Sequence, residues 1–356
     1  MNLKNYELIS QVQYMKAVIL EEFGGPQVLK IKDIAKPSIK HDEVLVQVKS
    51  VGICHHDIMH RSGLIPGAKT GVILGHETSG EIVETGSNVK NKKIGDRVVL
   101  YQRRFCNLCR NCLRGRQDMC KVAGMPGVDT EGGYAEFVAI PEISSQTIPK
   151  NLPWSSAALS SCPIGTSLRA VKTIGNICPG DTVLITGASG GLGVHQIQLV
   201  KAFGGISIAV TSSAEKAEQL KLIGADHVVV SKDNLFSAEV WKITEKLGID
   251  IAIENIGATL PETLRCMTQG GIVVVLGNIG AASINLTPGL LIGRRLRVVG
   301  SGSCTFEDLK QSISLLTSGV IKPVIAKTFK FTDVSAAHTL IESKKSIGRV
   351  VLEGWN

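Results

Sequence analysis

The sequence predicts an α/β protein with two domains, an irregular β domain and a doubly wound domain with a parallel sheet. Three observations support this prediction. The chain has 356 residues, which is about right for two domains of ordinary size. Short strand-like runs broken by turn residues fill the first part of the chain, and strands alternate with helices after about Pro163. With 44% apolar and 20% charged residues, the chain can bury substantial cores.

The first part of the chain contains short apolar runs separated by Gly, Pro and Asn, a pattern typical of an irregular all-β domain. Strands are expected, in chain order, at Ala17–Leu20, Glu43–Val51, Gly80–Thr85, Arg97–Leu100 and Ala135–Ile140. The residues before them, Met1–Gln13, contain no apolar signal-peptide core and are expected to form a short extension, with Met15 as an alternative translation start.

In the second part, strands and helices alternate, which indicates a parallel sheet with helices on both faces. The expected strands are Thr182–Thr186, Ile206–Val210, His227–Val230, Ile249–Ile253, Ile272–Leu276 and Arg297–Val299. The expected helices between them are Leu192–Phe203, Glu215–Leu222 and Ala238–Leu247. Gly204 follows the first of these helices and is placed as a C′ cap. A last helix, Phe306–Ser318, and two strand-like runs after it are expected to return to the first domain.

Charge and cysteine content narrow the class of protein. The formal net charge is +8, but the basic residues are scattered, so we expect a protein that binds phosphorylated small molecules and does not bind nucleic acid. The apolar runs have strand length, so no membrane span is expected. Nine cysteines, an odd number without a secretory signal, argue against a disulfide framework and favour metal ligands in a cytoplasmic protein.

Four cysteines lie close together with the spacing C-x2-C-x2-C-x7-C: Cys106, Cys109, Cys112 and Cys120. One loop with such spacing can wrap around a tetrahedral ion and supply four thiolates. Four thiolates leave Zn²⁺ no open position, so a structural zinc is expected. The alternatives are a [4Fe–4S] cluster, which no other electron-transfer feature accompanies, and unligated thiols, which would be chemically vulnerable on an exposed loop.

A glycine-rich turn follows the expected strand Thr182–Thr186 and opens a helix. Its residues are Gly187-Ala188-Ser189-Gly190-Gly191-Leu192-Gly193. A strand, a glycine turn and a helix inside a βαβ unit form the context that a dinucleotide site requires. Gly190 allows the backbone to approach a pyrophosphate, Gly193 lets helix and strand pack closely, and the helix N-terminus favours the phosphate charge. Flavin and nicotinamide dinucleotides both fit this pattern.

The end of the next strand indicates which nicotinamide cofactor is bound, because NAD sites usually have Asp or Glu there to bind the ribose 2′-hydroxyl. Here the strand ends Ala209-Val210-Thr211-Ser212-Ser213, and counting back from Gly224-Ala225 puts Thr211 at the acidic position. No carboxylate would repel a 2′-phosphate there, and Ser212, Ser213 and Lys216 are candidate ligands for it. The sequence therefore predicts a preference for NADP(H) over NAD(H).

A longer pattern, G-H-E-x2-G-x5-G-x2-V, begins at Gly75-His76-Glu77 and is completed by Gly80, Gly86 and Val89. It resembles the signature of the zinc-containing alcohol dehydrogenases, which belong to the medium-chain dehydrogenase/reductase superfamily. Cys54, Cys162 and the cysteine quartet match the family's remaining zinc ligands, and the resemblance covers nearly the whole chain from Met15. It implies a GroES-like catalytic domain formed by residues 1–163 and 302–356, with a structural zinc lobe at about 100–122, and a Rossmann cofactor domain formed by residues 164–301.

The resemblance also implies roles for individual residues. Cys54, His76 and Cys162 would bind a catalytic zinc and leave a fourth position for water or a substrate oxygen, so two zinc ions are expected in each subunit. Asp57 would accept a hydrogen bond from the His76 ring, and Glu77 would lie behind the zinc. The implied cofactor contacts outside the glycine turn are His55, Thr166, Asn255-Ile256-Gly257, Leu276-Gly277-Asn278 and Arg349. Zinc ligands favour a nicotinamide cofactor over a flavin.

One position departs from the family pattern. Alcohol-oxidising relatives usually have Ser or Thr two residues after the first cysteine ligand, and this hydroxyl relays the alcohol proton. Here that position holds His56. A histidine can relay protons near neutral pH, but its larger ring also narrows the pocket. Proton relay and space filling are therefore both open as roles for His56.

The leading hypothesis is an NADP(H)-linked alcohol dehydrogenase or aldehyde reductase that passes hydride between nicotinamide C4 and the carbon of a zinc-polarised carbonyl. The alternative is an enoyl-thioester reductase such as acryloyl-CoA reductase, which three stretches resemble: Gly187–Gln198, Gly277-Asn278 with Asn285-Leu286, and Ile321–Ala326. A non-enzymatic protein of this fold ranks last because all the zinc ligands are present. The substrate is a small molecule that the sequence does not identify, and a homodimer or homotetramer is expected.

Overall fold

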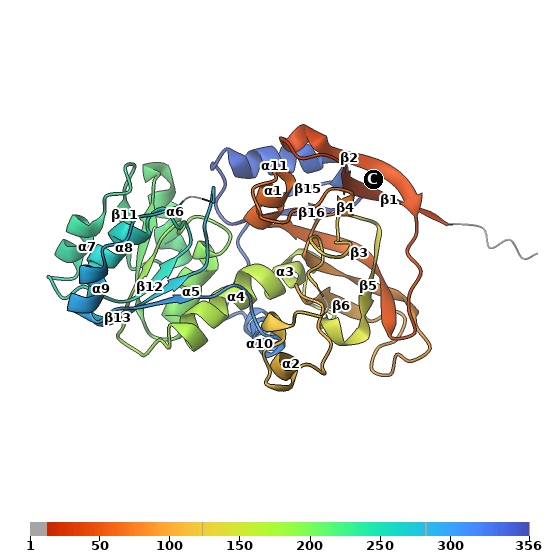
Figure 1. Cartoon of the computed structure of the whole chain (residues 1–356), viewed down its shortest axis with the longest axis horizontal. Helices are drawn as coiled ribbons and strands as arrows, with labels where there is room; N and C mark the ends of the chain where they lie inside the picture. Colours follow the sequence, from red (N-terminus) through yellow and green to blue (C-terminus); the bar gives the residue numbers. More distant parts are fainter. Residues whose placement is uncertain (1–12, 123, 282, 356) are drawn as a thin grey trace, which may run out of the picture.

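The computed structural model describes residues 13–122, 124–281 and 283–355. The expected extension at Met1–Gln13 therefore lies outside the described residues, apart from Gln13. Figure 1 shows a parallel sheet with its helices at one end of the molecule, the remaining sheets at the other end, and a helical stretch between them. The predicted α/β class is confirmed, because both expected kinds of sheet are present.

The larger sheet of the first domain combines strands from both ends of the chain. Its strands follow the order β15-β16-β3-β5-β6-β8, and β7 also pairs with β3. The bounds are β3 (Glu43–Ile53), β5 (Glu77–Thr85), β6 (Arg97–Leu100), β7 (Phe137–Pro141), β8 (Ser145–Thr147), β15 (Ile325–Phe329) and β16 (Arg349–Glu353). Because β16 pairs antiparallel with β3, the C-terminal segment forms part of this sheet.

A smaller antiparallel sheet has the order β2-β1-β4. Its strands are β1 (Tyr14–Leu20), β2 (Leu29–Ala35) and β4 (Val72–Ile73). Side chains of β1 are buried in one apolar core together with side chains of β3 and β5. The sequence did not predict β2, whose side chains are mostly exposed, or the two-residue β4. The helices at this end are α1 (His55–Arg61), α2 (Arg110–Leu113), α10 (Phe306–Thr317) and α11 (Val334–Glu342).

The second sheet is parallel throughout and has the order β11-β10-β9-β12-β13-β14. Its strands are β9 (Thr182–Ile185), β10 (Ile206–Thr211), β11 (His227–Val230), β12 (Ile249–Glu254), β13 (Met267–Val275) and β14 (Arg297–Gly300). This order is that of a Rossmann domain, and the chain switches direction across the sheet between β9 and β12. Ligands of such sheets bind at the carboxyl ends of the strands at the switch point.

Helices connect the parallel strands. They are α5 (Gly193–Ala202), α6 (Ala214–Ile223), α7 (Ser237–Ile243), α8 (Leu260–Cys266) and α9 (Pro288–Arg294). Gly204 has φ = +78° after α5, which agrees with its predicted place as a C′ cap. The predicted helix Ala238–Leu247 is too long, because Glu245 and Lys246 have φ values of 49° and 67° and cannot continue a right-handed helix.

A helical stretch joins the two sheet systems. It consists of α3 (Trp154–Ala158), a π-helical segment at Ser160–Gly165, α4 (Thr166–Leu168) and a second π-helical segment at Arg169–Ile174. Such wide turns are frequent at functional sites, and the first one contains Cys162. Among the described residues, no helix is both long enough and apolar enough to cross a membrane.

Candidate active site

Cys54, His76 and Cys162 come together from three separate elements. Cys54 is the N-cap of α1 directly after β3, His76 immediately precedes β5, and Cys162 lies in the π-helical segment. All three are buried, and the two Sγ atoms are 4.0 Å apart. With Glu77 they form a group whose candidate ligand atoms all lie within 4.8 Å of one another. The structure therefore brings the predicted ligand set together.

Asp57, on the first turn of α1, orients Cys54 and His76 within this group. The backbone N–H of Cys54 donates to Asp57 Oδ2 at 2.9 Å, and Asp57 Oδ1 lies 3.3 Å from His76 Nδ1. Nδ1 thus faces Asp57, while Nε2 lies on the side of the cysteine thiols and is 3.9 Å from Glu77 Oε1. Asp57 is fully buried, and the charge on His76 contributes to lowering its pKa against the opposing effect of burial. This arrangement leaves Nε2 to bind a metal ion.

Glu77 is fully buried beside the same group. Its carboxylate fills the space next to Gly52, where any Cβ would overlap Glu77 Oε2. Burial raises the pKa of Glu77 to about 7, and the guanidinium of Arg349, with Nη2 2.9 Å from Oε1, acts in the opposite direction. Two thiols, an imidazole and a carboxylate are a donor set that suits Zn²⁺. A zinc ion fits these residues.

Two histidines of α1 border the metal group. The His56 ring lies edge-on to the His76 ring, with 5.7 Å between the centroids. His56 Nδ1 is buried, and none of the described residues forms a hydrogen bond with it. Burial lowers the pKa of His56 and of its neighbour His55, so both rings are neutral near pH 7. A neutral His56 can accept a proton from a group bound beside the metal site.

The cysteine quartet also forms a compact group. Cys109 caps α2, and the Sγ–Sγ distances are 3.9 Å for Cys106–Cys112, 3.5 Å for Cys109–Cys112 and 3.7 Å for Cys120–Cys106. A tetrahedral zinc with Zn–S bonds of about 2.3 Å separates its sulfurs by about 3.8 Å. Backbone N–H groups of Leu108 and Cys109 lower the pKa of Cys106 to about 6, which favours the thiolate. The quartet therefore fits one zinc ion.

Aromatic packing anchors the lobe that carries the cysteine quartet, at about residues 100–122, to the rest of the chain. The rings of Tyr101, Phe105 and Phe306 pack together with centroid distances of 5.4–5.8 Å. From the neighbouring Gln102, the backbone N–H donates to Ser161 Oγ at 3.0 Å and the side-chain amide to Thr166 Oγ1 at 3.2 Å. The lobe is thus bonded to residues on both sides of Cys162.

The glycine turn occupies the switch point of the parallel sheet. It follows β9, and its first residue, Gly187, has φ = +58°. Gly190 N–H donates to the Gly187 carbonyl at 2.9 Å, and α5 begins at Gly193. A Cβ on Gly193 would lie 2.5 Å from backbone atoms of Ala188, so this glycine is needed for the helix to approach the strand. Gly191 lies against the guanidinium of Arg349.

The loops after β12 and β13 lie beside the turn. Ile256 packs against Gly187, and a Cβ on Gly277 would overlap the Asn255 carbonyl oxygen. Leu276 N–H donates to the carbonyl of Glu254, and the backbone of Asn278 lies against Gly257. The structure thus gathers the predicted cofactor residues of Asn255-Ile256-Gly257 and Leu276-Gly277-Asn278 around the glycine turn.

Glu254 is a residue that the sequence reasoning missed. Its carboxylate is fully buried at the end of β12. Oε1 accepts hydrogen bonds from Ile256 N–H at 3.0 Å, Gly257 N–H at 2.9 Å and Thr259 Oγ1 at 2.6 Å, while Oε2 accepts one from Thr263 Oγ1 at 2.6 Å. An acidic residue directly after the expected strand Ile249–Ile253 was the available signal.

The end of β10 carries the predicted selectivity residues. Thr211 is buried, and its Oγ1 accepts a hydrogen bond from Ser213 N–H at 3.3 Å. Ser213 is the N-cap of α6, with Ser212 before it. Lys216 Nζ donates to the carbonyls of residues 344 and 346 at 2.6 and 2.9 Å, so part of its bonding capacity is already used.

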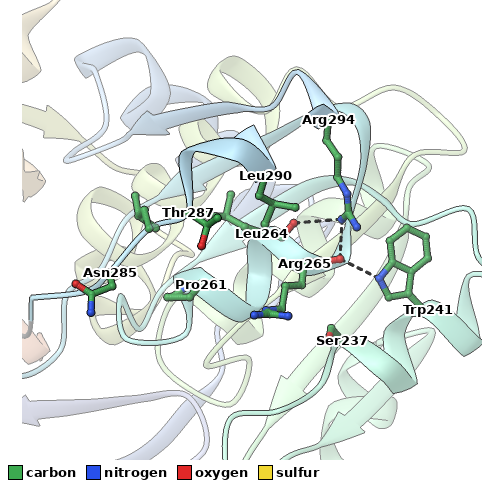
Figure 2. A pocket seen from close by; sticks show the side chains of 10 residues that line it. Ser237, Trp241, Pro261, Leu264, Arg265, Asn285, Thr287, Leu290 and Arg294 are labelled. Carbon is green, nitrogen blue, oxygen red and sulfur yellow. Dashed lines mark hydrogen bonds between the residues drawn. The ribbon is translucent and has the colours of Figure 1, made fainter. Parts of the chain in front are cut away.

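A cavity of about 410 Å³ lies elsewhere, at the outer end of the parallel-sheet domain between α7, α8 and α9 (Figure 2). Arg294 Nη1 donates there to backbone carbonyls at the end of α8, and the Trp241 indole donates to the carbonyl of Arg265. Asn285 and Leu286, a stretch that resembles the acryloyl-CoA reductases, line this cavity and not the metal group.

Known families and proteins match nearly the whole chain. The family described as "Alcohol dehydrogenase GroES-like domain" matches residues 40–150, and "Zinc-binding dehydrogenase" matches residues 191–318. An acryloyl-coenzyme A reductase of Sulfurisphaera tokodaii is 34% identical over 95% of this chain and 100% of its own length. An NAD-dependent alcohol dehydrogenase of Saccharolobus solfataricus is 32% identical over 95% of this chain and 99% of its own.

Among solved structures, the crystal structure of AibC has a TM-score of 0.90 and 37% identity, covering 99% of both chains. These likenesses extend over both kinds of sheet, and both metal groups are complete. The chain therefore belongs to the zinc-containing alcohol dehydrogenase family of the medium-chain dehydrogenases/reductases and is an NAD(P)-dependent zinc oxidoreductase of the alcohol dehydrogenase type.

Proposed function

We propose that this protein is an NADP(H)-linked alcohol dehydrogenase or aldehyde reductase. The observation that carries the proposal is the complete group of Cys54, His76, Glu77 and Cys162 next to a residue, Arg349, that also contacts the glycine turn. Hydride transfer requires the substrate carbonyl at the metal site and the nicotinamide ring to lie next to each other, and this arrangement supports such a placement. When bound, zinc polarises the carbonyl and the nicotinamide supplies the hydride.

The chain's own residues would then bind, orient and move a proton. Asp57 would fix the His76 ring, and Arg349 would contact the cofactor pyrophosphate. His56 would exchange the substrate proton, with His55 at the cofactor side of α1. The quartet would hold a structural zinc that keeps its lobe folded.

We further propose NADP(H) as the preferred cofactor, although three relatives are named NAD-dependent alcohol dehydrogenases. Support comes from Thr211, which occupies the position where a carboxylate would repel a 2′-phosphate. Ser212 and Ser213 stand at the N-terminus of α6, where the helix dipole favours negative charge. Lys216 adds positive charge nearby, although two carbonyls already bind its ammonium group.

The remaining proposals follow the family pattern. We propose a catalytic domain of residues 1–163 and 302–356 and a cofactor domain of residues 164–301. The protein would act in the cytoplasm as a homodimer or homotetramer, because most soluble oligomers are symmetric assemblies of one chain, with dimers and tetramers the commonest.

A second candidate is an enoyl-thioester reductase. The identity to an acryloyl-coenzyme A reductase favours it, and so does His56, because reduction of an alkene does not require the hydroxyl relay that this position usually supplies. Three stretches of the sequence also resemble that branch, although one of them, Asn285-Leu286, lines the outer cavity.

One experiment separates the two candidates. NADPH oxidation by the zinc-loaded protein is followed with small aldehydes and with acryloyl-CoA, before and after chelation, for wild type and for His56→Ser. Chelator-sensitive turnover of aldehydes, retained when Ser supplies the usual hydroxyl, supports the alcohol dehydrogenase proposal. Turnover of acryloyl-CoA without turnover of aldehydes would replace it by the second candidate.

A further inference from the structure

Helix α1 carries a second buried charged residue one turn after Asp57. Asp57 and Arg61 are four positions apart, so their side chains lie on the same face of the helix. Both side chains are about 1% exposed. Arg61 Nε donates to the Gly24 carbonyl at 3.0 Å, and Nη2 forms an ion pair with Glu342 of α11. Nε and Nη2 of the guanidinium are therefore held by these partners, and Nη1 is directed elsewhere.

That nitrogen begins a chain of contacts through α11. Arg61 Nη1 lies 3.3 Å from His338 Nδ1, and His338 Nε2 lies 3.1 Å from the Tyr134 hydroxyl. The Tyr134 and His338 rings meet edge-on with 5.9 Å between centroids, and both side chains are fully buried. The proposed mechanism uses neither residue.

The chemistry of these groups fixes the direction of the hydrogen bonds. A guanidinium can only donate, so His338 Nδ1 must accept. The imidazole is therefore neutral with its hydrogen on Nε2, which donates to the Tyr134 oxygen. Burial lowers the pKa of His338 to about 3, in agreement with a neutral ring. The Tyr134 hydroxyl is thus left with its own proton to donate.

Tyr134 also contacts the backbone that presents the zinc ligand His76. Gly75 has φ = +98°, and a Cβ there would lie 2.5 Å from the Tyr134 ring. Tyr134 N–H donates to the Leu74 carbonyl at 2.9 Å. Next to it, Gly133 N–H donates to the Gly75 carbonyl at 2.7 Å. The chain of contacts therefore ends at the backbone that presents His76.

We propose that Tyr134 and His338 are positioning residues that hold the backbone before His76, and with it the His76 ring, in the orientation required for metal binding. Arg61 fixes His338, His338 fixes the Tyr134 hydroxyl, and the Tyr134 ring packs against Gly75, which directly precedes His76. The inference rests on the proposed zinc site at Cys54, His76 and Cys162. Residues that orient a metal-binding histidine typically change metal affinity or activity 10- to 100-fold when replaced.

The test measures zinc release from the full-length, zinc-loaded protein by a chromophoric chelator. Wild type should hold two zinc ions per chain and release them in two phases, and the phase that His76→Ala lacks belongs to the site at His76. Tyr134→Phe keeps the ring over Gly75 and removes only the hydroxyl. We expect it to release zinc from this site about tenfold faster, at the lower end of the range for residues that orient a ligand.

Three further measurements separate positioning from a general loss of stability. Tyr101→Phe is the matched control, because it removes another fully buried tyrosine hydroxyl, which donates to the Cys304 carbonyl. It should lower Tm without changing zinc release at the His76 site. His338→Gln should accelerate release as Tyr134→Phe does, and the double variant should be no faster than the faster single variant, because one chain of contacts is broken in each case.

The cobalt-substituted protein gives a second readout. Tyr134→Phe should shift the cobalt absorption bands of the His76 site, whereas Tyr101→Phe should not. Unchanged release and unchanged cobalt bands in Tyr134→Phe, or equal acceleration in Tyr101→Phe, would overturn the inference while leaving the zinc site intact. A wild-type protein that holds one zinc ion, with the same count in His76→Ala, would instead overturn the proposed site itself.

Discussion

Replacement of Glu254 by Gln tests whether a buried carboxylate holds the loop that we place at the cofactor. The amide has the same shape, and its oxygen can accept the same three hydrogen bonds that Oε1 accepts from Ile256 N–H, Gly257 N–H and Thr259 Oγ1. Thr263 can rotate its hydroxyl to accept from the new NH2 group. Glu254→Gln therefore removes charge and preserves geometry.

The magnitude follows from these contacts. Hydrogen bonds to a charged acceptor contribute about 1 kcal/mol more than neutral ones, so three bonds lose roughly 3 kcal/mol. Relief of the cost of burying a carboxylate offsets part of this loss, which leaves about 1–2 kcal/mol. The expected fall in Tm is about 2–6 °C. Because the loosened loop contains Asn255-Ile256-Gly257, the Kd for NADPH should rise roughly three- to tenfold.

The assay is a fluorescence titration of zinc-loaded protein with NADPH, paired with calorimetric determination of Tm. Glu262→Gln is the control, since its carboxylate also accepts two backbone N–H bonds, from Phe236 at 3.1 Å and Ser237 at 2.8 Å, in the same domain. Glu262→Gln should lower Tm with an unchanged Kd. If Glu254→Gln lowers Tm equally and its Kd stays within twofold of wild type, Glu254 stabilises the domain without positioning the cofactor loop.

Three other outcomes are expected. Thr211→Asp should reduce the ratio of kcat/KM for NADPH to that for NADH at least ~tenfold, since the carboxylate repels a 2′-phosphate; an unchanged ratio contradicts the proposed cofactor preference. Cys106→Ser should remove one zinc per chain and cost ~4 kcal/mol or more of stability, and an unchanged zinc count and Tm would argue against a structural site. The neutral, buried His195 and His338 have pKa values lowered to about 4 and about 3, so between these values and about 6.5 the unfolded chain binds more protons. The free energy of unfolding should therefore fall from pH 7 to pH 5, by at most ~1.4 kcal/mol per pH unit for each histidine, while Glu77, with its pKa raised to about 7, offsets the effect of one histidine; equal denaturant midpoints would refute this.

Local patterns in the sequence were sufficient to predict a site when all of its residues lie on one short segment. The cysteine quartet and the glycine turn each occupy a short stretch, and the structure brings the residues of each together. By contrast, no spacing rule joins Cys54, His76 and Cys162, and a family resemblance was needed to connect them. Their approach depends on how β3, the strand that begins after His76 and a π-helical turn pack against one another, and no local pattern specifies this packing.

Buried polar residues were hardest to predict, because their partners come from distant parts of the chain. The Glu254 carboxylate accepts hydrogen bonds from the loop and helix that follow it, and the His338 ring lies between Arg61 of α1 and Tyr134. Helix propensity also misled at Glu245-Lys246, two good helix formers that adopt positive φ. Gly248, two residues after Lys246, has φ = +84° and packs against the backbone nitrogen of Thr268. The tight turn that leads into β12 therefore determines where α7 ends.

The metal group and the glycine turn adjoin different sheets, and residues of the C-terminal segment contact both. Val324 N–H donates to His195 Nε2 at 3.2 Å, while His195 Nδ1 donates to the Gly191 carbonyl at 2.7 Å. The imidazole must be neutral, because one ring nitrogen accepts and the other donates. Arg349 then contacts Gly191 on one side and Glu77 on the other. The relation between the cofactor turn and the metal group is therefore set by contacts such as His195–Val324, 129 residues apart in sequence, which is why no local motif could reveal it.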